Sequence, residues 1–125
     1  MKFDDRIPIY YQIKQYFYQQ IITQQLRPGD KLPGVRQLAV DLTVNVNTIQ
    51  RALQELITEG VLFSKRGLGN FVTTDADMIK QLKQRVVSGQ VAWYYQQLEK
   101  LGLSQAAMQQ ALADYIEEEN HDPKS

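Results

Sequence analysis

Residues 35–60, VRQLAVDLTVNVNTIQRALQELITEG, decide the fold of this chain. In the first part of this stretch apolar residues recur at helical spacing, at Val35, Leu38, Ala39 and Leu42. This spacing predicts a helix over about 33–42, beginning at Pro33. After a short break at 43–45, a second helix is expected over VNTIQRALQELITE, with Asn45 as its N-cap and Gly60 as its stop. Two helices joined by so short a break predict a helix-turn-helix.

The spacing inside this stretch fits a helix-turn-helix, with one departure. The two helices of such a unit cross tightly, so the fifth position must be small and the fifteenth branched and apolar. Counted from Val35, Ala39 is fifth, Thr43 ninth and Ile49 fifteenth. The glycine usual at the ninth position is absent, so Thr43 requires either a turn without a strongly left-handed φ or some strain. An ordinary helical hairpin in a small bundle is the alternative.

The flanking residues complete a winged-helix order. Apolar residues recur at helical spacing in IPIYYQIKQYFYQQIITQQL, which predicts a helix over about 8–25, ending before Pro28 and Gly29. Two β-prone runs, VLFS at 61–64 and NFVTT at 70–74, flank the segment KRGLG. They predict a hairpin with a basic tip. Helix, helix, turn, helix and hairpin form a mainly α fold with one small β-hairpin, in the α+β class.

From Asp75 onward the pattern is that of long helices with two apolar stripes. One stripe runs through Ile79, Leu82, Val86, Gly89 and Trp93, and the other through Val87, Val91, Tyr94, Leu98 and Leu101. Gly102 is expected to end this helix and Ser104 to cap a shorter one. So small a segment cannot bury both stripes alone, which favours a homodimer. The interface residues that we expect are Ile79, Leu82, Val86, Trp93, Tyr94, Leu98, Leu112 and Tyr115.

Two features of this C-terminal half offer a ligand site as an alternative. The adjacent aromatic residues Trp93, Tyr94 and Tyr95 could line a small-molecule pocket, but consecutive positions lie on different helix faces, which favours packing and interface roles. The single histidine, His121, follows Glu117, Glu118 and Glu119, where a weak metal site is conceivable. A solvated tail is the expected state of that segment, so we predict no metal and no cofactor.

Composition excludes several classes of protein. With 43% hydrophobic and 22% charged residues in 125, the chain is expected to fold as a globular protein. The absence of cysteine excludes disulfides, thiolate metal sites and cysteine nucleophiles. The start MKFDDRIPIY lacks the apolar run of a signal peptide, and no stretch of about 18 apolar residues occurs. A cytoplasmic protein without a membrane partner is therefore expected.

The charge is divided unevenly although the net charge is zero. Residues 1–74 hold nine Lys or Arg against six Asp or Glu, and residues 75–125 hold five against eight, so the halves carry +3 and −3. The basic half contains the helix-turn-helix, which favours DNA as its partner. We predict a DNA-binding domain over 1–74, a helical dimerisation segment over 75–119 and a frayed tail over 120–125.

The two competing functions are an enzyme and a protein-interaction module. An enzyme is disfavoured because the folded region has no histidine or cysteine, and KRGLGNF lacks the end of a phosphate-binding loop. A winged helix that binds protein instead of DNA is the stronger alternative. It would expose an apolar patch where a DNA-binding protein needs Arg36, Arg51, Lys65 and Arg66.

Several motifs in order resemble the winged-helix domain of the GntR family of bacterial transcription regulators. They are IPIYYQI, LRPGDKLPGVRQLA, VNVNTIQRALQELITEG and RGLGNFV, over residues 7–73. The short tail is similar to the YtrA-like subgroup, in which two helices serve dimerisation. The resemblance implies a sequence-specific transcription regulator that binds double-stranded DNA. A twofold dimer would bind an inverted-repeat operator, and because such binding across a promoter blocks polymerase, repression is the first expectation and activation the alternative. No site for a small-molecule effector is evident.

The resemblance also implies roles for particular residues. Arg36 lies where members contact phosphates, although a surface ion pair with Asp41 or Glu55 is the alternative. On the recognition helix, base-edge or phosphate contacts are expected from Asn45, Asn47, Thr48, Gln50 and Arg51, with helix capping equally suited to Asn45. Val46 and Gln50 stand where many members have arginines, so those members' operators do not transfer. At the wing the DNA-binding residues are expected to be Lys65, Arg66, Gly67 and Gly69.

Overall fold

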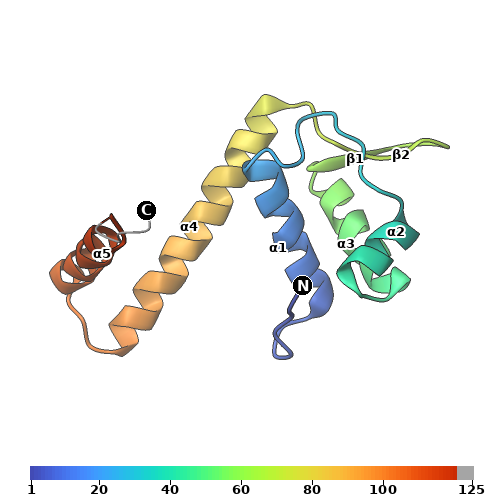
Figure 1. Cartoon of the computed structure of the whole chain (residues 1–125). Helices are drawn as coiled ribbons and strands as arrows, with labels where there is room; N and C mark the ends of the chain where they lie inside the picture. The colour runs from blue at the N-terminus through green and yellow to red at the C-terminus, as the bar shows by residue number, and fades with distance from the viewer. Residues whose placement is uncertain (121–125) are drawn as a thin grey trace. The chain divides into compact units, whose positions relative to one another are not determined.

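The computed structural model describes residues 1–120 and contains five helices and one two-stranded sheet over that range (Figure 1). The elements are α1 (Ile9–Ile22), α2 (Val35–Leu42), α3 (Val46–Thr58), β1 (Leu62–Lys65), β2 (Gly69–Val72), α4 (Ala76–Lys100) and α5 (Gln105–Asn120). This order confirms the predicted winged helix-turn-helix followed by two helices. The chain divides into two compact units, Met1–Val86 and a second that begins at Val87.

The helix-turn-helix forms with a left-handed residue at its turn. Thr43 has φ 56° and ψ 51°, so of the two possibilities predicted for this position the structure has the strained one. The turn then leads into Asn45, whose side-chain oxygen accepts a hydrogen bond from the Asn47 backbone N–H at 2.7 Å. This bond satisfies one of the free N–H groups at the start of α3. Asn45 is therefore the N-cap, as predicted.

The core of the first unit is formed where α3 packs on α1, α2 and β1. Its most deeply buried large side chains are Ile13, Phe17, Ile21, Ile49, Leu56, Val61, Leu62, Val72 and Leu82. Ala39 and Ile49, the positions expected to be small and branched, are both buried in it. Removing this apolar surface from water is the main term that stabilises the unit.

The first part of α4, which holds three of the residues expected at a dimer interface, packs against this core. Leu82 is only 2% exposed, and Ile79 and Val86 pack against the same buried cluster. Leu82 is thus covered within the chain, while Ile79 and Val86 are covered only in part. Periodicity showed that this stripe must be buried but did not identify its partner. The compact first unit accordingly extends to Val86, beyond the predicted domain end at residue 74.

The hairpin is tighter than predicted and has a third backbone segment beside it. Lys65 pairs with Gly69, which leaves a three-residue loop in place of the five residues expected. On the free side of β2, Lys31 forms a bridge to Phe71, and the Leu32 N–H donates to the Asn70 carbonyl at 2.9 Å. The segment after α1 therefore holds the base of the hairpin in place.

The second unit contains the remainder of α4, a turn and α5. Gly102, at φ 82°, lies in the turn that follows α4. The Ser104 side chain accepts a hydrogen bond from the Ala107 N–H at 3.2 Å and so caps α5, as predicted. The Tyr94 hydroxyl donates to the Met108 carbonyl at 3.0 Å, and Met108 is buried. Over residues 1–120 every helix is too short or too polar to cross a bilayer.

Candidate nucleic-acid interface

The recognition helix α3 is divided into an apolar side and a polar side. Its buried residues are Ile49, Ala52, Leu53 and Leu56. The opposite side carries a stripe of exposed polar residues, Asn47, Gln50, Arg51 and Gln54. These positions are spaced three, one and three residues apart, so they share one face of the helix. Gln54 was not predicted as a site residue, although its periodicity with Asn47 and Gln50 could have identified it.

Two predicted residues at the start of α3 have partners within the helix. The Asn45 side-chain oxygen is used by the cap, so the capping alternative describes this structure. The Thr48 backbone N–H donates to the Asn45 carbonyl at 3.1 Å, and the residue is half-buried, which leaves less of it to meet a groove. The side chains best placed to meet a major groove therefore begin at Asn47, one residue after the start of the helix.

Arg51 is exposed but held in a defined place. Its guanidinium carbon lies 3.7 Å from the centre of the Tyr10 ring, a cation–π contact, and its Nε lies 3.4 Å from Glu55 Oε2. The side chain remains 61% exposed. A guanidinium resting on an aromatic ring has fewer rotamers to lose, which lowers the entropic cost of binding a phosphate or base edge.

Arg36 is exposed at the start of α2 and takes no part in an ion pair among residues 1–120. The two partners proposed for a surface pair are engaged elsewhere. Asp41 accepts a hydrogen bond from Gln37, and Glu55 pairs with Lys14 and Arg51. The guanidinium of Arg36 is thus available for an anion.

The wing tip is a tight turn that exposes its cations. The Leu68 N–H donates to the Lys65 carbonyl at 2.9 Å, and Gly67 at the third turn position has φ 76°, as a type II turn requires. Lys65 Nζ lies 5.2 Å from the centre of the Phe71 ring, which stacks on Phe63. Arg66 and Gly69 are exposed beside it.

Lys31 adds a cation next to the wing that the sequence did not indicate. A Cβ atom placed on Gly69 would lie 3.3 Å from Lys31 Cε, so the lysine stem passes close over that glycine. Lys31 is exposed and is brought there by its bridge to Phe71. Because Lys31 and Gly69 are far apart in the chain, no local pattern could have connected them.

A charged cluster behind the recognition helix ties three helices together. In what we call the Glu59 cluster, Glu59, the C-cap residue of α3, accepts hydrogen bonds from Tyr18 of α1 and from Arg85 of α4, the latter at 3.2 Å, and pairs with Lys14. Lys14 also reaches Glu55 at 3.0 Å. These contacts fix how α3 sits on α1 and on the first part of α4.

Ionisation in this cluster follows its contacts. Burial alone would lower the pKa of Lys14, but hydrogen bonds to Glu59 and Glu55 outweigh it and keep that pKa above its ordinary value. Burial, followed by the hydrogen bond to Glu59, raises the pKa of Tyr18 to about 12. The hydrogen bond from Lys14 holds the pKa of Glu55 below its ordinary value. Lys14 and Glu55 are therefore charged together at neutral pH.

We expect Glu59→Gln to lower the free energy of unfolding by about 2 kcal/mol, because the variant loses hydrogen bonds between a carboxylate and charged or buried donors. Urea unfolding at one fixed protein concentration measures this loss, with Glu99→Gln on exposed α4 surface as the control. A loss below about 0.5 kcal/mol would mean that water screens the cluster and that packing alone positions α3.

The polar stripe of α3, Arg36 and the basic wing all lie within a region that matches one known family. A model of the gntR family of bacterial regulatory proteins matches residues 9–72. The chain belongs to the GntR family. The family match covers α1, α2, α3 and the β1–β2 hairpin, and hence every residue discussed above for this interface except Arg85.

Relatives of this GntR chain match it beyond the winged helix. The uncharacterised transcriptional regulator YhcF of Bacillus subtilis is 33% identical over 93% of this chain and 96% of its own length. The transcriptional repressor YtrA of the same organism is 36% identical over 75% of this chain and 68% of its own length. The chain is thus similar to YtrA, in agreement with the resemblance of its short helical tail to the YtrA-like subgroup.

Solved structures agree with this assignment. A GntR family transcriptional regulator from Listeria monocytogenes superposes with a TM-score of 0.82 at 34% identity, covering 93% of this chain and 98% of that one. The DNA-binding domain of AraR, solved in complex with operator ORX1, has a TM-score of 0.52 at 31% identity, covering 54% of this chain and 81% of that one. The AraR match is to a protein seen on DNA.

The sequence also raised a metal site. Among residues 1–120 no group of three or more His, Cys, Asp or Glu side chains is arranged to hold a metal ion. His121, the residue that suggested a weak site, lies outside the described residues.

Proposed function

We propose that this GntR regulator represses transcription by binding an inverted-repeat operator as a homodimer. The observation that carries the proposal is the exposed stripe Asn47, Gln50, Arg51 and Gln54 on the recognition helix, flanked by Arg36 and a basic wing. Amide and guanidinium groups are those that pair with base edges in a major groove. The AraR domain, solved on its operator, is a relative of the same region.

The second unit supplies the argument for a dimer. Several of its large apolar residues are exposed, among them Trp93 at 62%, Tyr115 at 61% and Leu112 at 46%. Leu98 and Tyr94 are half-buried, and the Tyr94 hydroxyl is already used by Met108. So much exposed aromatic and aliphatic surface on a few turns of helix favours an interface with a second copy.

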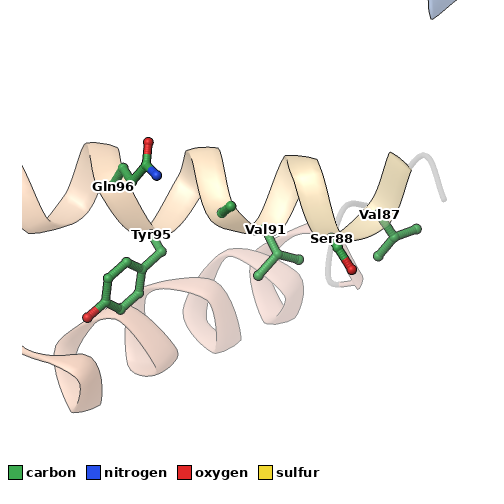
Figure 2. Close-up of a pocket in the computed structure, with 6 residues that line it drawn as sticks. Val87, Ser88, Val91, Tyr95 and Gln96 are labelled. Carbon is green, nitrogen blue, oxygen red and sulfur yellow. The ribbon is translucent and has the colours of Figure 1, made fainter. Parts of the chain in front are cut away.

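A groove on α4 belongs to the same apolar surface. It has a volume of about 420 Å³ and is lined by Val87, Ser88, Val91, Ala92, Tyr95 and Gln96. Figure 2 shows Val87, Val91 and Tyr95 projecting from one side of the helix, away from Gln96. We place the partner's helices against this side. Only Tyr95 of the three adjacent aromatic residues lines this groove, which favours packing over an aromatic cage for a small molecule.

Symmetry then sets the form of the operator. A twofold dimer presents two recognition helices to half-sites about 34 Å apart, so the operator is an inverted repeat. Occupying such a site across a promoter blocks polymerase, in line with the relative YtrA, a named repressor. Genomic DNA as the ligand places the protein in the cytoplasm, and we assign it no catalytic role.

We expect Arg51→Ala to weaken operator binding by roughly 1 to 3 kcal/mol while leaving the dimer intact. The alanine variant loses a base-edge or phosphate contact. Arg51→Lys keeps the charge but not the planar guanidinium, so its operator affinity should lie between those of the wild type and Arg51→Ala. Fluorescence anisotropy on a labelled duplex gives the affinity, and light scattering the oligomeric state. Unchanged binding by the alanine variant would remove Arg51 from the interface.

The proposed function is tested by selecting fragmented genomic DNA with the purified wild type and with Arg51→Ala in parallel. Enrichment of a few inverted-repeat fragments by the wild type, reduced in the variant, would support an operator-binding regulator. No specific enrichment by either protein would instead favour a winged-helix module that binds another protein.

A further inference from the structure

The tip of the wing carries a leucine that the rest of the chain does not cover. Leu68 is 58% exposed and lies between Gly67 and Gly69, which both have positive φ. In Figure 1 the tip of the β1–β2 hairpin projects away from the helices of the first unit. A Cβ added to Gly67 would meet nothing within 4 Å. Leu68 therefore lies on a turn without bulky neighbouring side chains, with open space beside Gly67.

The residues around Leu68 are those that bring a hairpin tip onto DNA. Lys65 and Arg66 precede it on the turn, and the stem of Lys31 passes over Gly69. Cations in such positions are suited to neutralise phosphates on either side of a groove. Leu68 cannot take part in that neutralisation, since it has neither charge nor hydrogen-bonding groups. Its contribution must come from removing apolar surface from water.

We propose that Leu68 is a specificity-determining residue that enters the minor groove of the operator as an apolar wedge between two base pairs. Apolar side chains on narrow elements are used in this way to unstack a base step and bend the duplex. The two flanking glycines lack the side chains that would hinder backbone approach. This proposal rests on the proposed function, because it presupposes that the wing meets operator DNA.

A wedge at this position makes the wing sensitive to sequence without hydrogen bonds to bases. Pyrimidine–purine steps open and kink at lower cost than other steps, so the proposal predicts such a step where Leu68 enters each half-site. The polar stripe on α3 would then recognise base pairs in the major groove, and Leu68 would recognise a flexible base step outside the base pairs that α3 contacts.

The experiment is a selection from a random duplex library with the wild type and three variants, Leu68→Ala, Leu68→Met and Leu68→Lys. We expect the wild type to enrich an inverted repeat containing a flexible step outside the major-groove half-sites, and Leu68→Ala to keep the half-sites but lose the step preference. On the enriched duplex Leu68→Ala should bind about tenfold more weakly for each half-site, the size of one lost base-step contact. Leu68→Met conserves volume and should stay within about twofold.

Salt and fluorescence distinguish a wedge from a phosphate contact. Leu68→Ala should leave the slope of log affinity against log salt unchanged, while Leu68→Lys should steepen it by about one per chain without restoring the step preference. With 2-aminopurine at the predicted step, wild type and Leu68→Met should brighten on binding and the other two should not.

Equal affinity, equal step preference and no fluorescence change in Leu68→Ala would overturn the wedge while leaving the operator-binding function in place. Failure of the wild type to enrich any duplex would reject the proposed function itself and the wedge with it.

Discussion

Affinity for the operator should fall by about 10³- to 10⁵-fold between about 50 and 200 mM salt, if the dimer contacts about 6 to 10 phosphates. Each chain exposes five cations at the candidate interface, at Lys31, Arg36, Arg51, Lys65 and Arg66. Every phosphate that they neutralise releases counterions, and the entropy of that release is lost as bulk salt rises. Anisotropy titrations at four or five salt concentrations give the slope.

Single-cation variants test the origin of this slope. Arg36→Ala and Arg66→Ala should each flatten it by about two per dimer, because each chain loses one phosphate contact. Gln37→Ala, next to Arg36 on exposed α2 surface, is the matched control and should leave the slope unchanged. An affinity that does not depend on salt would contradict the DNA-binding mechanism and favour an apolar, protein-binding role.

Placing a charge on the apolar surface of the second unit should convert the dimer to a monomer and lower operator affinity by about 10² to 10⁴-fold. Trp93→Asp and Leu112→Asp change exposed side chains, so the fold of a single chain should survive. The dimer should not, because burying an unpaired carboxylate in an interface is costly. Without the partner, each recognition helix binds its half-site alone and the gain from linkage is lost.

Analytical ultracentrifugation gives the oligomeric state of these variants, and anisotropy on the inverted repeat gives the affinity. Gln84→Asp adds the same charge to exposed α4 surface in the first unit and serves as the control. A Trp93→Asp variant that remains a dimer with full affinity would show that α4 and α5 do not join the two chains.

Much of the candidate interface could be predicted because its elements are local. The N-cap at Asn45, the stop at Gly60 and the apolar periodicity of α3 each depend on a few neighbouring residues. Once the buried side of α3 is known, the exposed side follows from 3.6 residues per turn. Gln54 lies on that exposed side, one turn after Gln50, so the same periodicity could have predicted it.

The residues that sequence reasoning missed or placed elsewhere depend on distant contacts. Lys31 reaches the wing through a bridge to Phe71, and the Glu59 cluster joins α1, α3 and α4. Leu82 was expected at the dimer interface because its stripe had to be buried somewhere. A hydrophobic pattern predicts that a side chain is buried. Because the hydrophobic effect is non-directional, the pattern does not identify which surface buries it.

The sequence by itself therefore determined the winged helix-turn-helix, its N-cap, the polar face of α3 and the family, since these follow from local periodicity, turn chemistry and motif order. Only the tertiary structure decided that Leu82 belongs to the core of the first unit, that Thr43 is left-handed and that Lys31 stands beside Gly69. Each of these depends on which segments meet in space, and that choice is set by packing over the whole unit and by no short stretch of the chain.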